Sequence, residues 1–211
     1  MKAAQNTSIL QADSLRFSHP NQELFNNFSA SIPPRITLIR GGDGCGKSTL
    51  LRLLAGALPL QSGQLHINGI SLQTQPENYA AHVFLADPRT DSFDQFTVPD
   101  YFEIQRDKHA GFNDSELAEL TIGLGLQEHL PKQLFMLSTG SKRKVFLAAA
   151  LASGAQVTLL DDPFAALDVA SIRFVLVWLN AAASVSDRAW VITGHVTPDG
   201  LRLAHIINLG D

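Results

Sequence analysis

The sequence of 211 residues is poor in cysteine and in charge, and each shortage excludes a class of protein. Its single cysteine, Cys45, excludes an internal disulfide and suits a reducing compartment. Charged residues make up 17% of the chain and apolar residues 45%, a balance typical of a globular protein and not of a disordered one. The formal net charge of -4 argues against a nucleic-acid-binding surface, which needs an excess of Lys and Arg.

Long apolar stretches are also missing. The longest, residues 145–160, is interrupted by Ser153, Gly154 and Gln156 and is too short to cross a bilayer. The beginning of the chain lacks the continuous apolar run of a signal peptide. We therefore expect a cytoplasmic protein that reaches a membrane only through a partner.

Apolar stretches bounded by turn residues alternate with helix-like stretches, which predicts an α/β fold. Strands are expected at residues 15–17, 36–39, 83–85, 157–160 and 189–193, a hairpin at 63–69, and helices at 47–56 and 169–183. The region from about 91 to 152 lacks a clear strand and predicts a helical subdomain, inserted into one domain that spans residues 1–211.

The strongest motif is the glycine-rich stretch at residues 41–48, Gly-Gly-Asp-Gly-Cys-Gly-Lys-Ser, between an expected strand and an expected helix. Glycines let backbone N–H groups converge on phosphates, and the helix directs the positive end of its dipole at the same anion. Lys47 supplies a charge for the β- and γ-phosphates, and the Ser48 hydroxyl is the expected Mg²⁺ ligand. The expected cofactors are therefore ATP and Mg²⁺. The nucleotide-binding residues expected from this loop are Gly41, Gly42, Asp43, Gly44, Cys45, Gly46, Lys47, Ser48 and Thr49.

A second motif is the buried-strand run at residues 157–160, which ends in two acids. We expect the strand to deliver Asp161 beside the phosphate loop as a Mg²⁺ ligand. Asp162 would then face the γ-phosphate, where a carboxylate can orient and activate the attacking water. The alternative is a strand that merely ends in an acidic turn.

With these residues placed, the chain resembles the ATP-binding-cassette (ABC) ATPases along essentially all of its length. Residues 137–141, Leu-Ser-Thr-Gly-Ser, resemble the family signature, and residues 163–168 resemble the loop after the two acids. His195 resembles the switch histidine that contacts the γ-phosphate in the family, although an ordinary surface or capping histidine is the alternative. Phe17 falls where the family has an aromatic residue that stacks on adenine, with simple core packing as the alternative.

The resemblance implies a P-loop NTPase core with a mostly parallel sheet, an antiparallel β subdomain and an inserted helical subdomain. It implies a second ABC ATPase domain, in a homo- or heterodimer. Ser138 and Gly140 of this chain would then complete the phosphate site of that second domain. It also implies integral membrane transporter subunits as partners, and a peripheral position at the inner face of the cell membrane. Within the family, residues 162–169 and the chain length are similar to the cytochrome-c-maturation haem exporter ATPases, although this local likeness establishes no cargo.

Three positions depart from the family pattern. Asp87 stands where a Gln normally follows the strand, and its carboxylate could still bind Mg²⁺ through water. Asp162 replaces the usual, longer catalytic Glu, and the signature carries Thr139 and Ser141 in place of a Gly and a Gln. Slow hydrolysis is therefore a hypothesis to be tested.

Two functions from different classes remain open. The first is a transporter motor, in which ATP binding closes a dimer, hydrolysis reopens it, and separate membrane subunits receive the motion. The second is a degenerate switch subunit that binds ATP with little or no hydrolysis. A third function, action on nucleic acid or ribosomes, lacks the basic surface that it needs. An aromatic cluster (Phe93, Phe96, Tyr101 and Phe102) could receive a membrane-subunit helix or could equally be core.

Overall fold

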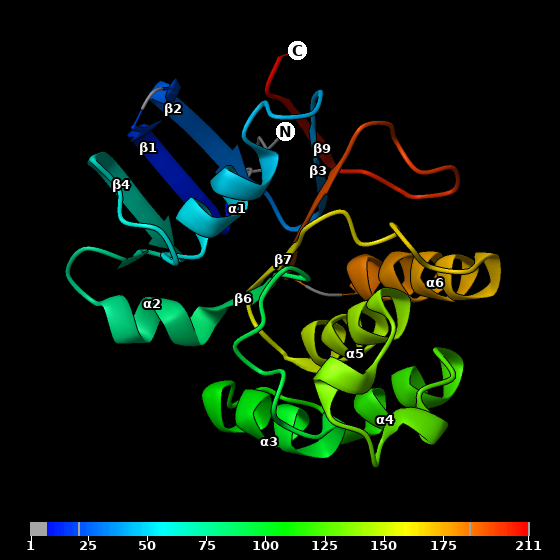
Figure 1. The fold of residues 1–211 in the computed structure, drawn as a ribbon. Coiled ribbons are helices and arrows are strands. Elements are labelled where there is room, and N and C mark those ends of the chain that lie inside the picture. Colours follow the sequence, from blue (N-terminus) through cyan, green and yellow to red (C-terminus); the bar gives the residue numbers. More distant parts are fainter. Residues whose placement is uncertain (1–7, 21, 186, 211) are drawn as a thin grey trace.

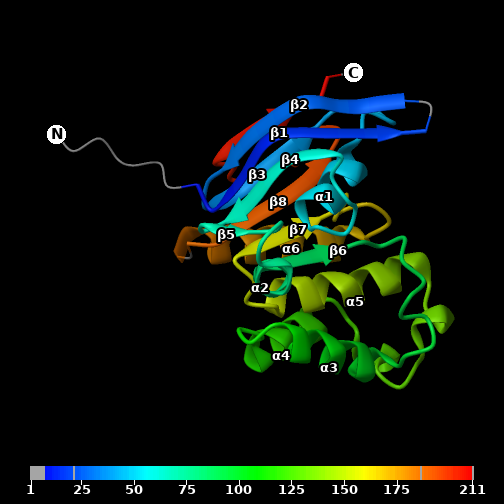
Figure 2. The same cartoon turned by 90° about the vertical axis from the view of Figure 1, so that its left-hand side faces the viewer.

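The computed structural model describes residues 8–20, 22–185 and 187–210 of the protein. In this part of the chain the strands form a four-stranded sheet of order β2-β1-β4-β5 and a five-stranded sheet of order β6-β7-β8-β3-β9. The first sheet is antiparallel and the second is parallel. Both sheets stand above a group of helices (Figure 2). The expected α/β class, with a parallel and an antiparallel sheet, is confirmed.

The antiparallel sheet consists of β1 (Leu10–His19), β2 (Gln22–Ile32), β4 (Ser62–Ile67) and β5 (Ile70–Ser71). Strands β4 and β5 form the hairpin expected at residues 63–69. Its turn residues, Asn68 and Gly69, both have positive φ angles, of 48° and 83°. Asn-Gly favours this conformation because asparagine and glycine tolerate positive φ better than other residues.

The parallel sheet consists of β3 (Arg35–Arg40), β6 (Val83–Ala86), β7 (Val157–Leu160), β8 (Ala189–Gly194) and β9 (His205–Asn208). Strand β7 is buried along its whole length, as its continuous apolar run predicts. Because these strands are parallel, the segments that follow β3, β6, β7 and β8 meet at one edge of the sheet.

Helix α1 (Lys47–Leu54) lies between the two sheets. Its four leucines are buried in one cluster with Leu10 and Leu65 of the antiparallel sheet and Ile39 of the parallel sheet. Gly56, with a φ of 70°, follows the end of the helix as expected. The other face of the parallel sheet is covered by α5 (Thr139–Ala152) and α6 (Val169–Val185).

The remaining helices are α2 (Pro76–His82), α3 (Val98–Lys108) and α4 (Asp114–Gly123), with 3-10 turns at Gln127–His129 and Leu134–Met136. Helices α3 and α4 lie with α5 below the sheets in Figure 1. In the aromatic cluster, Tyr101 and Phe102 are buried in the core, whereas 41% of Phe96 is exposed. The core interpretation therefore holds for these two rings. Of the described helices, none has both the length and the apolar character needed to cross a bilayer.

Candidate active site

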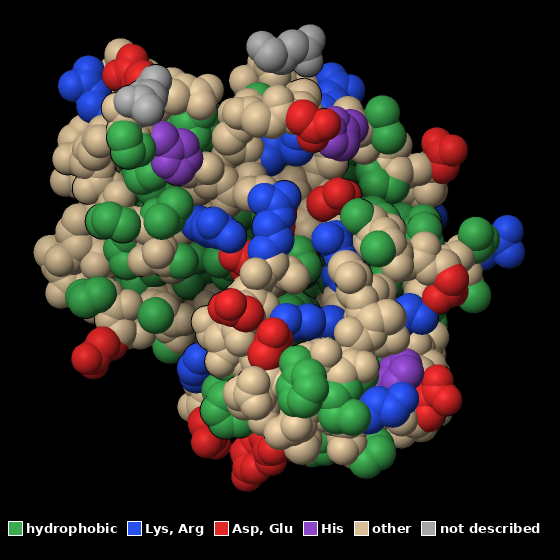
Figure 3. All heavy atoms as spheres, viewed as in Figure 1, with side chains coloured by type: hydrophobic (Ala, Val, Ile, Leu, Met, Phe, Trp, Pro, Cys, Tyr) green, Lys and Arg blue, Asp and Glu red, His purple; other side chains and the backbone are tan. Residues whose placement is uncertain are grey.

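A cavity of about 330 Å³ lies at the carboxyl edge of the parallel sheet. Besides Asp43, Gly44, Gly46 and Thr49 of the expected nucleotide-binding segment, it brings together five residues that the sequence singles out: Lys47, Ser48, Asp161, Asp162 and His195. They come from the start of α1 and from the ends of β7 and β8. On the face shown in Figure 3, Lys and Arg side chains gather around the hollow middle of the molecule. The expected meeting of phosphate loop and acidic strand is thus present.

The phosphate loop has the backbone that its glycines allow. Gly44 and Gly46 have φ angles of 77° and 98°, in the region that side chains disfavour. The Lys47 ammonium donates hydrogen bonds to the carbonyl oxygens of Gly41, at 2.7 Å, and Gly42, at 2.6 Å. Within the described part of the chain Lys47 bonds carbonyl oxygens and no carboxylate, so its charge is available to an anion in the loop.

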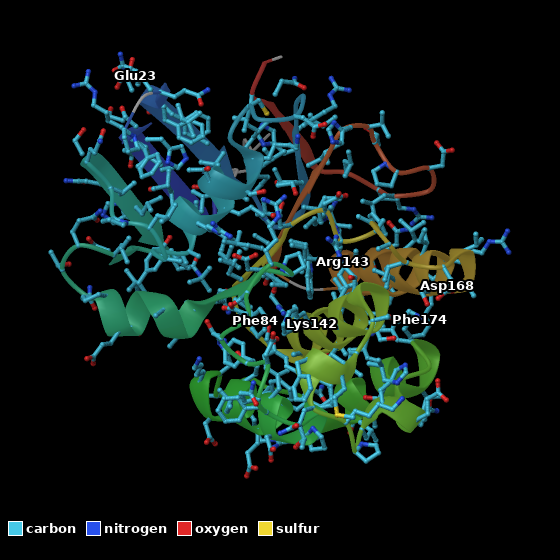
Figure 4. All side chains as sticks on the ribbon, in the orientation of Figure 1. Glu23, Phe84, Lys142, Arg143, Asp168 and Phe174 are labelled. Atoms are coloured by element: carbon cyan, nitrogen blue, oxygen red, sulfur yellow. The ribbon has the colours of Figure 1, made fainter. Side chains whose placement is uncertain are left out.

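The two acids after β7 are held by one residue of β8. The buried Thr193 hydroxyl donates to Oδ1 of Asp161 at 2.8 Å and accepts from the backbone N–H of Asp162 at 2.8 Å. The carbonyl oxygen of Asp162 accepts a hydrogen bond from Arg143 of α5 at 2.7 Å, and Figure 4 labels Arg143 close to this loop. Asp162 has a φ of 47° and an exposed side chain. Its backbone is therefore fixed on both sides while its carboxylate faces the solvent side of the cavity.

His195 lies at the mouth of the cavity, next to the phosphate loop. Its Nε2 is 3.2 Å from Oδ1 of Asp43, and both side chains are more than half exposed. The surface alternative for His195 is thus compatible with its exposure, but the residue lies where the family resemblance expects it. Its role toward a γ-phosphate stays a prediction.

For Phe17 the structure favours the alternative of core packing, and stacking on adenine stays a prediction. Phe17 is 9% exposed, belongs to the core with Phe25, and does not line the cavity. Its ring packs edge-to-face on His19, at 5.1 Å between centroids, and His19 does line the cavity. The physical reason is that Phe17 faces inward with Leu15 on β1, whereas His19 ends the strand beyond the core.

The binding of Mg²⁺ by Asp87 through water stays a prediction, and in the structure its carboxylate has another partner. Asp87 does not line the cavity, because its Oδ2 is held by Nε and Nη2 of Arg52 at 2.9 and 2.7 Å. Arg89, two residues further on, lines the cavity instead. Arg89 is not among the site residues predicted from the sequence, although a cation three residues after a parallel strand is a signal for this edge.

The signature segment lies outside the cavity of its own chain. Ser138 is the N-cap of α5 and accepts a hydrogen bond from the N–H of Ser141 at 3.1 Å. A side chain on Gly140 would come within 2.7 Å of the carbonyl oxygen of Ala166, in the loop after the acids. Neither Ser138 nor Gly140 lines the cavity, so their expected phosphate contacts remain predictions about a second domain.

The same loop is tied to α5 by an ion pair. Nζ of Lys144 donates to Oδ2 of Asp168 at 2.6 Å, and the two carboxylate oxygens of Asp168 also accept from Ser171 at the start of α6. The hydrogen bond from Lys144, with those from Ser171, holds the pKa of the Asp168 carboxyl well below its usual range. This carboxylate therefore joins α5 to the start of α6.

The donor set at the cavity fits Mg²⁺ that is bound together with phosphate. Across residues 8–20, 22–185 and 187–210, no group of three or more His, Cys, Asp and Glu could hold a metal ion by itself. Ser48 and Asp161 nevertheless offer a hydroxyl and a carboxylate at one cavity. Mg²⁺ prefers such oxygen ligands and commonly takes only one or two from the protein, with phosphate and water filling the other positions.

Comparisons with known proteins agree with this geometry. The family model described as ABC transporter matches residues 25–165. The cytochrome c biogenesis ATP-binding export protein CcmA of Wolbachia pipientis wMel is 34% identical over 197 residues, covering 92% of this chain and 92% of that protein. The iron(3+)-hydroxamate import ATP-binding protein FhuC of Bacillus subtilis (strain 168) is 26% identical over 205 residues, which cover 93% and 76% of the two chains. A solved ATP-binding subunit of an ABC transporter shares the fold, with a TM-score of 0.78, 21% identity, and 90% and 80% of the chains covered.

Proposed function

Because the chain belongs to the ABC transporter family and is an ATP-hydrolysing transporter subunit, we propose that the cavity at the phosphate loop holds its magnesium–ATP. The observation that carries this proposal is that Lys47, Ser48 and Asp161 line one cavity. The alternative of a switch that binds ATP without hydrolysis finds no support among the relatives, which are named for export and import.

Each residue of the cavity has a distinct role in this proposal. The Lys47 ammonium binds the β- and γ-phosphates, and Ser48 with Asp161 would hold Mg²⁺, which neutralises part of the phosphate charge. Asp162 accepts a hydrogen bond from the attacking water and orients it. His195 contacts the γ-phosphate from the mouth of the cavity, where its Nε2 lies 3.2 Å from Oδ1 of Asp43.

The proposal is tested by ATP binding to the purified protein with Lys47→Ala. Loss of a charged hydrogen-bond donor is expected to weaken ATP binding about 10- to 100-fold. Lys108→Ala removes the same charge from a residue outside the cavity and serves as the control. Titration calorimetry measures both. If Lys47→Ala binds ATP as tightly as the natural protein, the cavity is not the ATP site.

The partners that we propose are integral membrane subunits and a second ATP-binding domain. Ser138 and Gly140 at the start of α5 are then expected to contact the nucleotide of the second domain. The domain would lie at the cytoplasmic face of the membrane through these subunits. A groove of about 650 Å³ between α2 and β6 on one side and α3 and α5 on the other is the proposed dock for a membrane-subunit helix. Its aromatic floor includes Phe93 and Tyr101, and its rim carries Glu77 and Lys108.

This dock is tested by filling the groove. Ala81→Trp places an indole in the wall of the groove and is expected to reduce co-purification of the membrane subunits about 10-fold or more, because a helix no longer fits. Ala181→Trp makes the same change on the exposed side of α6 and should leave co-purification unchanged. Equal recovery of the membrane subunits with both variants would rule out this groove as the dock.

A further inference from the structure

Arg89 is a cation of the active-site cavity that neither the phosphate loop nor the acidic strand accounts for. It lies in the loop that follows β6 and lines the same cavity as Lys47 and Asp161. Its side chain is exposed to that cavity, and among the described residues its guanidinium forms no ion pair. A guanidinium beside a phosphate site has five donors in a planar fork, which matches phosphate oxygens.

Two residues outside the cavity fix the loop that carries Arg89. Arg52 of α1 donates two hydrogen bonds, from Nε at 2.9 Å and from Nη2 at 2.7 Å, to Oδ2 of Asp87. The other carboxylate oxygen of Asp87, Oδ1, accepts the backbone N–H of Arg89 at 3.0 Å. Since α1 begins at Lys47, this chain of contacts ties the position of Arg89 to the helix of the phosphate loop. Asp87 is therefore placed to act on the cavity through Arg89.

The order of the strands indicates which part of a nucleotide Arg89 faces. Strand β6 is at the edge of the parallel sheet, and its neighbour β7 ends in Asp161 and Asp162. Arg89 thus enters beside the two acids, which is the side of the terminal phosphate in the proposed site. His19 and Gln22, from the antiparallel sheet, line another part of the cavity.

The structure does not fit a role of Arg89 that is limited to neutralising the carboxylates of the cavity. Asp162 is exposed next to the cavity, yet Arg89 and Asp162 form no ion pair in the part of the chain that is described. Lys47 is likewise paired only with carbonyl oxygens. Both cations are therefore available to an anionic ligand, and a triphosphate supplies more negative charge than Lys47 alone can balance.

We propose that Arg89 binds the terminal phosphate of ATP and that Asp87 and Arg52 position it, an inference that rests on the proposed function of the cavity. Arg89 then stands near the place where the family carries a Gln, but with a positive charge. It provides discrimination between ATP and ADP, because ADP lacks the phosphate that Arg89 contacts. Asp87 and Arg52 are positioning residues and touch no nucleotide.

The experiment compares the affinities of the protein for Mg-ATP and Mg-ADP, which titration calorimetry measures at low temperature. Arg89→Gln is expected to weaken ATP binding about 10-fold, at the lower end for a charged hydrogen bond because the side chain is exposed, and to change ADP binding less than about twofold. Arg89→Lys keeps the positive charge without the planar fork of donors, and its affinity for ATP should lie between those of the natural protein and Arg89→Gln. Arg173→Gln removes one exposed positive charge from α6 and is expected to change neither affinity.

The positioning role has its own readout. Asp87→Asn weakens the pair with Arg52 and is expected to reduce ATP affinity about threefold while sparing ADP, and its effect should largely disappear in an Arg89→Gln background. Equal losses for ATP and ADP with Arg89→Gln, or no loss at all, overturn the role of Arg89. If the role of Arg89 is overturned but Lys47→Ala loses ATP binding in the same series, the proposed function of the cavity remains intact. A natural protein that binds neither nucleotide overturns both.

Discussion

Asp162→Asn is expected to lower the rate of ATP hydrolysis roughly 100- to 10,000-fold, the range for removal of a general base, and to leave ATP affinity within about threefold. The backbone of Asp162 is fixed by Thr193 and Arg143, which sets the point from which its side chain enters the cavity. Asparagine has the same shape and tolerates the φ of 47°, and the fold should therefore not change. The loss is confined to the carboxylate that orients water.

Single-turnover hydrolysis together with ATP titration separates these two effects. Asp162→Glu is the matched variant, because it keeps the carboxylate and adds one methylene group. We expect it to hydrolyse ATP within about 10-fold of the natural rate, since only the reach of the carboxylate changes. If Asp162→Asn hydrolyses ATP as fast as the natural protein, another group orients the water and the role of Asp162 is refuted.

The elements that the sequence predicts correctly are those with a strong local signal. The glycine-rich loop needs positive φ at Gly44 and Gly46 and is followed directly by a helix with four buried leucines. Strand β7 is predicted with the bounds that the structure has, because a fully buried parallel strand is a continuous apolar run. Parallel strands bring their carboxyl ends together, and for this reason the meeting of Lys47 and Asp161 could be predicted as well.

Strands with a weak apolar pattern could not be found in the same way. Strand β2 has only Phe25 and Ile32 fully buried along Gln22–Ile32, and Asn27 has a φ of 61° where the pairing with β1 is irregular. Strand β9 has no fully buried residue and lies at the edge of the parallel sheet. In β2 the alternation of apolar and polar residues is limited to residues 28–32, because Asn26 and Asn27 interrupt it, and β9 is too short to show one. Both strands are defined by pairing with their neighbours in the sheet more than by their own pattern.

Two candidate site residues, Asp87 and Phe17, lie outside the cavity for reasons that their motifs do not contain. Asp87 turns from the cavity because Arg52, 35 positions earlier, holds its carboxylate. Phe17 is buried because the strand continues two residues beyond it, and His19 reaches the cavity instead. Spacing within a motif fixes a backbone position to within one or two residues. It does not fix the direction of a side chain, which tertiary partners decide.

Gly154→Ala is expected to destabilise the protein by about 3 kcal/mol, because it combines backbone strain with a clash. Gly154 lies two residues after the end of α5 and has a φ of 68°. A methyl group there would lie 2.1 Å from the carbonyl oxygen of Gly111, in the segment that follows α3. Both sides of this contact are backbone, and the neighbouring hydrogen bond from the N–H of Asn113 to the carbonyl of Ala152, at 2.8 Å, holds them together.

Gly125→Ala is the matched control, since Gly125 has a φ of 66° and no atom lies within 4 Å of the added methyl group. It should cost about 1 kcal/mol from backbone strain alone. In thermal unfolding we expect the midpoint to fall by about 10 °C for Gly154→Ala and about 3 °C for Gly125→Ala. Equal shifts would mean that the segment around Gly111 moves aside freely. In that case this contact would not join helices α3 and α4 rigidly to the sheet. The two helices could then move relative to the sheet at the segment around Gly111.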